Sequence, residues 1–415
     1  MKTAEKLALL GTLYLAQGLP YGFFEQALPV IMREQGVSLK DIGLASLVAL
    51  PWALKFLWSP LVDGLGWARV GLRRSWILPL QALSVVSLLA LSGVDPVAGL
   101  TVVLAGVFFV NLLSATQDIA TDGLAVTILT PRERGLGNGL QVAGYRVGMI
   151  IGGSLLLVVY HRYGWPLVFV SMAAIMALTS VPIALHREAP AAADEGSRAA
   201  TRGERGAGAL LQGVDWRALI DFTRRPGGAL WLVVVAGYKL GVHFGTAMLG
   251  PLLSDLGLSI EQIGLLKGAA GFVAGLAGAL IGGALVNALG RRRALISFGV
   301  LQALAVAAFA LPVLLPPTSA LLYAVVIAEH FASGMATAAL FTMMMDISRP
   351  EAAGAEYTLQ ASAVVLTSIA AAALSGFSAQ ALGYAAHFLL AGGLALLALL
   401  PVLIFMSRGS VDPAR

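Results

Sequence analysis

The chain contains no cysteine and little charge. None of its 415 residues is Cys, and Asp, Glu, Lys and Arg together make up 12%. Without Cys there are no disulfides, no thiolate metal sites and no dithiol redox chemistry. Soluble domains carry about 25% charged residues, so this chain has too few to cover a surface that faces water.

Motifs of common enzyme classes are also missing. There is no phosphate-binding GxxxxGK[ST] and no HExxH, which argues against ATP as the energy source and against this class of metalloprotease. The candidate histidines His243 and His330 lie within predicted membrane spans. Two histidines without further metal ligands do not predict a metal site. We therefore expect no enzyme activity, no cofactor and no bound metal.

What the chain has in abundance is apolar sequence. Hydrophobic residues make up 58%, and the mean hydropathy is +0.85. The apolar runs are long, continuous and rich in Leu and Ala, which favours membrane helices over the alternating strands of a barrel. The formal net charge is +5, but the basic residues form short clusters between the apolar runs, so nucleic acid is not an expected partner. The predicted fold class is an all-α integral membrane protein, and its medium is the lipid bilayer.

Segments of the length that spans a bilayer, about 20 residues, recur in two sets of six. A stretch with few apolar residues separates the sets and is predicted to be a flexible linker. The predicted domains are an N-terminal half (1–186), a cytoplasmic linker (187–226) and a C-terminal half (227–415). The predicted spans are 7–32, 41–62, 75–93, 99–129, 134–160, 165–185, 227–253, 260–287, 294–313, 318–345, 355–382 and 385–407.

Lys and Arg concentrate in one set of loops, together with both termini and the linker. By the positive-inside rule, these parts are cytoplasmic, as in a multi-pass protein of the bacterial inner membrane. The two halves also repeat short motifs: GVSLKDIGL (36–44) returns as GLSIEQIGL (257–265), and LQAL (80–83) returns at 301–304. Twelve spans in two parallel repeats with a cytoplasmic linker predict the major facilitator architecture.

Polar side chains inside predicted spans are the candidate site residues, because a charge in the bilayer costs several kcal/mol. In this architecture the first, fourth, seventh and tenth spans line the central cavity, and all four carry such residues. Lys239, His243, Glu329 and His330 fall near the bilayer midplane and form the sharpest constellation. The full set of predicted substrate-binding residues is Tyr14, Gln17, Tyr21, Glu25, Gln117, Asp118, Tyr145, Arg146, Tyr238, Lys239, His243, Glu329 and His330.

Several of these residues have two interpretations. Asp118 and Arg146 are expected at similar depth on adjacent spans, where pairing would relieve two buried charges. That pair either holds two helices together or contacts the substrate or a proton. Glu329 with Lys239 is either a fixed ion pair or a switchable proton site. The predicted proton-coupling residues are Asp118, Asp122 and Glu329.

A second group of charges is predicted to act in gating. Asp63, Arg73 and Arg74 lie in the loop after the second span and form a cytoplasmic charge cluster, which we expect to hold the two halves together. Lys55 lies inside the second span, where its side chain either reaches the cytoplasmic interface or acts within the membrane.

Three longer motifs resemble the AmpG-related branch of the major facilitator superfamily. They are KFLWSPLVD (55–63), SATQDIATD (114–122) and ERGLGNGLQVAGYRVGMIIGG (133–153). The resemblance is strong over 7–185 and weaker in the second half. The branch contains anhydromuropeptide permeases, acetyl-CoA transporters and siderophore permeases. Carried over residue by residue, it points to Lys55, Gln117, Asp118, Asp122, Tyr145 and Arg146.

Within the branch, LYLAQGLPYGFFEQALPVIMREQG (13–36) looks most like the siderophore permeases of the RhtX/FptX type. That resemblance implies an inner-membrane importer of a pyochelin-like siderophore, expected to carry iron. The architecture predicts alternating access, the intramembrane carboxylates predict coupling to protons, and we expect a monomer. The alternatives are an anhydromuropeptide permease for peptidoglycan recycling, or a transporter of another amphipathic small molecule.

Overall fold

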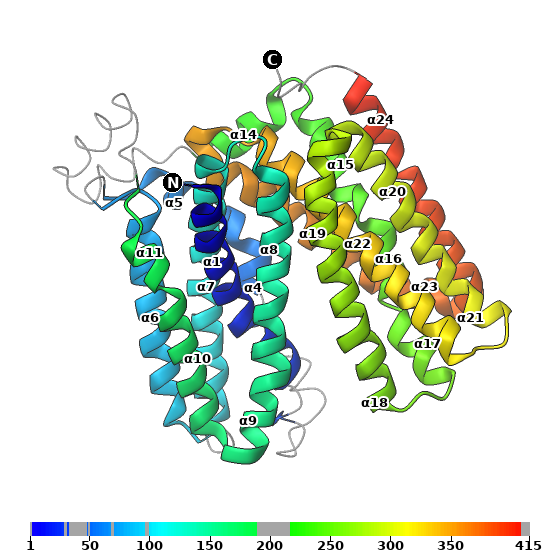
Figure 1. Ribbon diagram of the computed structural model, residues 1–415, viewed down its shortest axis with the longest axis horizontal. Helices are drawn as coiled ribbons and strands as arrows, with labels where there is room; N and C mark the ends of the chain where they lie inside the picture. Colours follow the sequence, from blue (N-terminus) through cyan, green and yellow to red (C-terminus); the bar gives the residue numbers. More distant parts are fainter. Residues whose placement is uncertain are drawn as a thin grey trace. The chain divides into compact units, whose positions relative to one another are not determined.

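The computed structural model describes residues 2–28, 31–32, 48, 50–67, 70–95, 99–188 and 216–407. This part of the chain is built almost entirely from helices, which confirms the predicted all-α class (Figure 1). Most of 41–49, where the second predicted span begins, and 189–215 of the predicted linker lie outside the described residues.

The chain forms two compact units, and each is described by itself. Unit 1 comprises 1–128, 143–218 and 348–358, and unit 2 comprises 129–142, 219–347 and 359–415. The units therefore follow the predicted halves except for two short segments, 129–142 and 348–358, each of which belongs to the unit of the other half. The predicted linker also contains a helix, α14 (Arg217–Arg224).

Unit 1 contains the first six predicted spans, several of them interrupted by tighter or wider turns. α8 begins in unit 2 and continues into unit 1. The elements are α1 (Thr3–Gly22), π-helical η1 (Phe23–Ala27), α4 (Leu50–Leu54), 3₁₀-helical η3 (Lys55–Leu57), α5 (Ser59–Gly64), α6 (Arg74–Ser92), α7 (Leu100–Ile128), α8 (Arg134–Ile150), π-helical η4 (Ile151–Leu155), α9 (Leu156–Tyr163), α10 (Trp165–Thr179) and α11 (Val181–Leu185).

Unit 2 contains the last six predicted spans. Its elements are α15 (Gly228–Tyr238), α16 (Leu240–Thr246), α17 (Leu249–Asp255), α18 (Ile260–Ile263), π-helical η5 (Gly264–Gly271), α19 (Phe272–Leu289), α20 (Arg291–Ala307), 3₁₀-helical η6 (Ala308–Ala310), α21 (Leu311–Leu314), α22 (Ser319–Ile347), 3₁₀-helical η7 (Pro350–Ala352), α23 (Ala353–Leu397) and α24 (Leu399–Ser407). The segment 348–358, with η7 and the start of α23, belongs to unit 1.

Within the described residues, ten helical stretches are long and apolar enough to cross a membrane. The sequence predicted twelve, and two features account for the difference. The second predicted span is described only in part. The last two predicted spans form one continuous stretch, 350–407, in which Gly383 has a non-helical backbone (φ 76°) and turns the chain at the predicted boundary.

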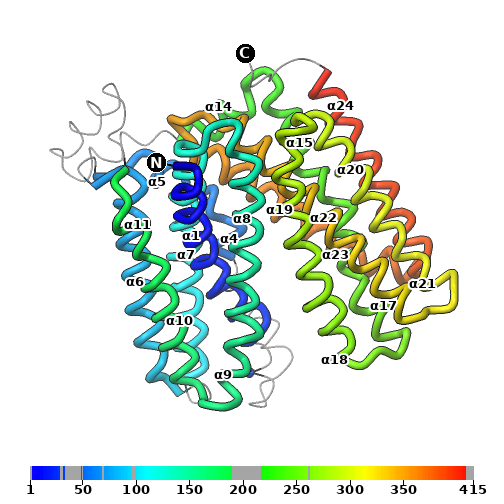
Figure 2. Tube along the Cα trace, in the orientation of Figure 1, coloured from blue at the N-terminus to red at the C-terminus, as the bar shows by residue number. Residues whose placement is uncertain are grey.

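Both units bury an apolar core and expose apolar side chains outward. In unit 1, α6 packs against α7 and α10, and α1 packs against α7; in unit 2, α22 packs against α19 and α20 (Figure 2). Large apolar side chains such as Leu178 (70% exposed) and Phe377 (73% exposed) lie on the outside. This pattern suits a protein whose outer surface contacts lipid.

Candidate functional site

A buried charge cluster lies at the centre of unit 1. Lys55 forms an ion pair with Asp118 on α7, and its Nζ lies 4.0 Å from Oδ2 of Asp122, one turn further along. The Tyr14 hydroxyl on α1 donates a hydrogen bond of 2.9 Å to Oδ1 of Asp122. All four residues are buried. Three separate elements thus hold one lysine against two carboxylates.

The ion pair differs from the predicted one. The sequence predicted Arg146 as the partner of Asp118, and the structure gives it Lys55. Arg146 on α8 is half-buried. Lys55 begins the 3₁₀ segment η3, which interrupts the second span, and this tighter winding changes the direction in which the side chains point. The sequence alone gave no sign of the interruption.

Three aromatic rings gather beside this cluster. The ring centroids of Tyr21, Trp52 and Tyr145 are 5.6 to 6.1 Å apart, in edge-to-face or tilted arrangements. The Lys55 Nζ lies 5.7 Å from the centre of the Trp52 ring. The indole Nε1 of Trp52 donates a hydrogen bond of 2.9 Å to Asn111 Oδ1. These contacts bring the predicted Tyr21 and Tyr145 together with Trp52, which the sequence reasoning missed.

Both glutamines of the predicted site bury polar atoms that have no partner among the described residues. They are both amide atoms of Gln17 on α1 and the Nε2 of Gln117 on α7. Gln17 is 1% exposed and Gln117 2%. An unsatisfied buried polar group costs about 1–3 kcal/mol, so such groups call for an explanation. The predicted Glu25 lies in η1 and is exposed.

Unit 2 holds its own buried lysine. Lys239 lies at the break between α15 and α16, and its Nζ donates to Gln302 Oε1 (3.2 Å), Ser333 O (3.1 Å) and Ser333 Oγ (2.8 Å). Gln302 in turn donates to the main-chain oxygen of Tyr238 at 3.0 Å. The Tyr238 hydroxyl donates to Leu295 O on α20, so this predicted site residue is fully buried in a helix contact.

The carboxylate of unit 2 has a histidine beside it. Glu329 is 2% exposed, and its Oε2 lies 2.9 Å from Nδ1 of His330, the next residue on α22. The same Nδ1 lies 3.0 Å from Val326 O. Glu329 is also within electrostatic range of His243 and Lys267. The structure thus assigns Glu329 a titratable partner, where one interpretation of the sequence was a fixed ion pair with Lys239.

The predicted gating cluster is formed in unit 1. Arg73 pairs with Asp63, and Asp63 also accepts hydrogen bonds from the backbone N–H groups of Gly354 (3.1 Å) and Ala355 (2.5 Å) at the start of α23. The backbone N–H of Arg74 donates to the carboxylate of Glu188 at 3.0 Å. Asp63 therefore combines an ion pair with the positive end of a helix.

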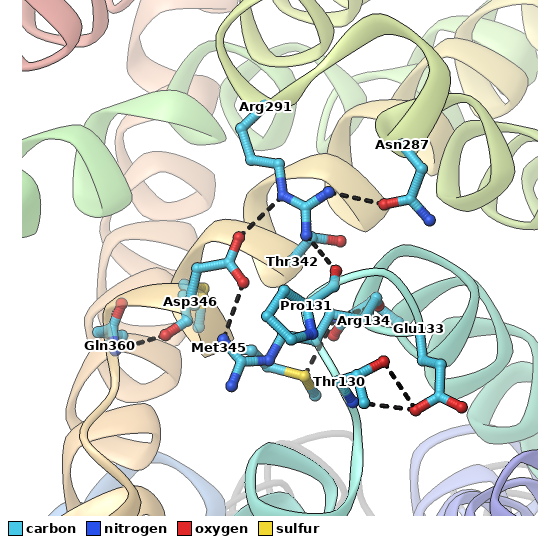
Figure 3. Close-up of polar contacts among 12 residues, drawn as sticks. Thr130, Pro131, Glu133, Arg134, Asn287, Arg291, Thr342, Met345, Asp346 and Gln360 are labelled. Carbon is cyan, nitrogen blue, oxygen red and sulfur yellow. Dashed lines mark hydrogen bonds and ion pairs between the residues drawn. The ribbon is translucent and has the colours of Figure 1, made fainter. Parts of the chain in front are cut away.

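A further charge cluster in unit 2 was missed by the sequence reasoning. Asp346, at the end of α22, is fully buried and accepts from Arg134 Nη1 (2.8 Å) and Arg291 Nε (2.9 Å) (Figure 3). Arg291 also donates to Pro131 O and to Asn287 Oδ1. All of these residues flank predicted spans, where charges are common and give no distinct signal in the sequence.

These features define a class of protein. A model of the Major Facilitator Superfamily matches residues 10–354 and 231–415, so the chain belongs to this superfamily. It is a multi-pass transporter of the inner membrane, as predicted.

Among its relatives, the chain is 29% identical to the anhydromuropeptide permease of Escherichia coli (strain K12), over 98% of this chain and 81% of the relative. It is 27% identical to the putative transporter AmpG 4 of Rickettsia felis, over 95% of this chain and 94% of the relative. It is 31% identical to an uncharacterised protein of Haemophilus influenzae, over 89% and 87%. These relatives confirm the AmpG-related part of the predicted resemblance.

Solved structures support the fold. The human organic anion transporter MFSD10 (TETRAN) superposes with a TM-score of 0.70 at 17% identity, over 97% of this chain and 100% of that one. A bacterial homologue of the iron transporter ferroportin, in an outward-facing state, gives 0.68 at 15% identity, over 98% and 100%. At these identities the likeness concerns the fold alone.

Proposed function

We propose that the chain imports anhydromuropeptides into the cytoplasm by alternating access. The observation that carries the proposal is the similarity to the E. coli anhydromuropeptide permease over 98% of this chain. The predicted siderophore substrate gains no support from the relatives described above. The anhydromuropeptide permease, the alternative in the sequence analysis, is therefore the better reading.

The cluster in unit 1 has the chemistry that such a ligand needs. A muropeptide joins sugar rings, whose C–H faces stack on aromatic rings, to a peptide with amides and carboxylates. Tyr21, Trp52 and Tyr145 supply aromatic faces, and Lys55 lies next to them as a cation. The unpartnered amide of Gln17 offers a donor and an acceptor for hydroxyl and amide groups, and the unpartnered Nε2 of Gln117 offers a donor.

In this proposal the lysine and the glutamines exchange partners during transport. Lys55 is held by Asp118 and Asp122 in the structure, and a ligand carboxylate would compete with them for it. Gln17 and Gln117 are covered in the structure, so helix movement must uncover them before they bind the ligand. Binding then satisfies amide groups that are unsatisfied beforehand, which favours the uncovered state.

The proton site is proposed to be Glu329 with His330. We choose this pair because the Glu329 carboxylate lies against an imidazole with which it can exchange a proton, whereas Asp118 and Asp122 lie against the Lys55 ammonium. The charged and titratable groups around Glu329 are His330 on its own helix, Lys239 and His243 near the α15–α16 break, and Lys267 in η5. Asp118 and Asp122, the other predicted proton-coupling residues, bind Lys55 and are assigned to the substrate side.

Transport in proteoliposomes tests the substrate. Purified protein is reconstituted, a proton gradient is imposed, and uptake of a radiolabelled anhydromuropeptide is compared with that of ferric pyochelin. We expect uptake of the anhydromuropeptide alone, abolished by a protonophore. Uptake of ferric pyochelin alone would restore the siderophore reading and refute the present one.

Substrate exchange without a gradient tests the proton site separately. We expect Glu329→Gln to lose uphill accumulation and its dependence on pH, yet to retain exchange of labelled for unlabelled substrate. Asp118→Asn should instead weaken exchange itself, because it disturbs the substrate side. Full, pH-dependent accumulation by Glu329→Gln would exclude this carboxylate as the coupling site.

A further inference from the structure

The short helix α14 (Arg217–Arg224) has two distinct apolar edges. Ala218 and Phe222, four residues apart, are 2% and 0% exposed and pack against the protein. Trp216 and Ile220, also four residues apart, are 46% and 51% exposed. Residues spaced by four lie on one side of a helix, so one apolar edge meets the protein and the edge on the opposite side of the helix is open.

Basic residues border the open edge. Arg217 and Arg224 are exposed and follow Trp216 and Ile220 around the helix, and Arg225 stacks over the Phe222 ring with its guanidinium 4.6 Å from the ring centre. Tryptophan beside arginine on an amphipathic helix is typical of a segment in the headgroup region of a bilayer. Asp221 is the acidic residue of the helix.

The position of α14 in the chain also points to the membrane surface. Pro226 and Gly227 follow the helix, and Gly227 has a positive φ (84°) that turns the chain directly into the membrane span that begins with α15 at Gly228. The basic residues of this region place it on the cytoplasmic side. α14 thus lies directly before a membrane span and carries an exposed Trp216/Ile220 edge bordered by arginines. We expect such a helix to face the inner leaflet.

We propose that α14 binds the anionic phospholipids of the cytoplasmic leaflet. Trp216 and Ile220 insert at the boundary between headgroups and acyl chains, and Arg217 and Arg224 bind the phosphate groups above them. The contact would anchor the chain to the lipid surface directly before the span that begins with α15. This inference does not depend on which solute is transported.

The absence of cysteine makes a clean test possible. Ile220→Cys carries the only thiol of the full-length protein, which is labelled with a nitroxide and reconstituted in nanodiscs of phosphatidylcholine, with or without phosphatidylglycerol. Collision with oxygen and with a water-soluble nickel chelate reports the depth of the label. We expect the label to lie below the phosphates, about 5–10 Å into the bilayer boundary, when the anionic lipid is present. Thr223→Cys, three residues further along the same exposed edge and labelled in the same way, should lie at a similar depth.

Charge variants then test the headgroup contact. A basic residue contributes about 1 kcal/mol at an anionic surface, so each Arg→Gln change is expected to lower the inserted fraction relative to the free one about fivefold. Arg217→Gln with Arg224→Gln should therefore bring the label into water, whereas Arg292→Gln with Arg293→Gln, the same charge change at exposed positions of α20, should not. A label at 220 that is open to water in both lipids overturns the proposal. So does insertion that ignores both the anionic lipid and the two arginines.

Discussion

Among the described residues, each unit buries one lysine, and the two lysines have different neighbours. In unit 1, Lys55 faces the carboxylates of Asp118 and Asp122. In unit 2, Lys239 donates to the uncharged oxygens of Gln302 and Ser333, while the carboxylate of Glu329 lies against His330. Unit 1 thus pairs its lysine directly with carboxylates, whereas in unit 2 the lysine donates hydrogen bonds to uncharged oxygens and the carboxylate lies against a histidine.

The repeated LQAL motif shows the same divergence at a single residue. Gln302, in the second copy, bridges Lys239 and the main chain of Tyr238. Gln81, in the first copy, is 0% exposed, and its two amide atoms have no partner among the described residues. One glutamine position therefore organises a polar network in one unit and buries an unsatisfied group in the other. Sequence repetition preserved the residue type and not its contacts.

The largest effect is expected from breaking the ion pair in unit 1. Lys55→Met leaves Asp118 buried without its counter-charge, which should lower the free energy of unfolding by about 3–5 kcal/mol. The measurement is SDS-induced unfolding of the full chain in mixed micelles. Lys55→Met combined with Asp118→Leu should recover most of the loss. A double variant no more stable than Lys55→Met would show that the pair is not the stabilising contact.

A smaller effect is expected from the equivalent change in unit 2. Lys239→Met leaves neutral oxygens on Gln302 and Ser333, and the cost of such unsatisfied acceptors is about 1–3 kcal/mol. The same unfolding measurement ranks the two lysines directly. If Lys239→Met destabilises as much as Lys55→Met, the expected difference between a lysine paired with carboxylates and one hydrogen-bonded to uncharged oxygens fails.

The smallest effect should come from one of the two glutamines of the repeated LQAL motif, Gln81. Gln302→Leu removes both hydrogen bonds of a bridging amide and should cost about 1–3 kcal/mol. Gln81→Leu removes polar atoms that have no partner, so stability should stay the same or increase. Melting temperatures of the two variants, measured side by side, decide the point. If both variants lower the melting temperature equally, Gln81 is not an unsatisfied group and the contrast between the two glutamines fails.

The fold was predictable from the sequence because span length and apolar composition determine it. Continuous apolar runs predicted the spans, and even the last boundary, near 383–385, coincides with the turn at Gly383. Partner choice was less predictable. Span depth placed Asp118 near Arg146, but the 3₁₀ turn at Lys55 brings a different cation to it. Local winding of this kind follows from tertiary packing and leaves little trace in composition.

Contacts that depend on residues far apart in the chain were the least predictable. Asp346 collects arginines from α20 and from the start of α8, and the sequence shows only three charges at the ends of spans. The same holds for the aromatic group, since Trp52 joins Tyr21 and Tyr145 only through packing. The predicted Asp63–Arg73 cluster was found because its members lie ten residues apart.

The contact between α1 and α8 leaves no space for side chains along part of its length. A Cβ atom at Gly18 or Gly22 would overlap the main chain of Tyr145 or Met149, and one at Gly148 would overlap the main chain of Leu15. Where two backbones touch, there are no side-chain rotamers to rearrange, so sliding of one helix along the other meets hard atoms immediately. We therefore expect α1 and α8 to move together as one rigid pair. Any bending of unit 1 would then occur where its helices are interrupted. A methyl group added at one of these glycines would push the two backbones apart, because the atoms that it meets belong to the main chain.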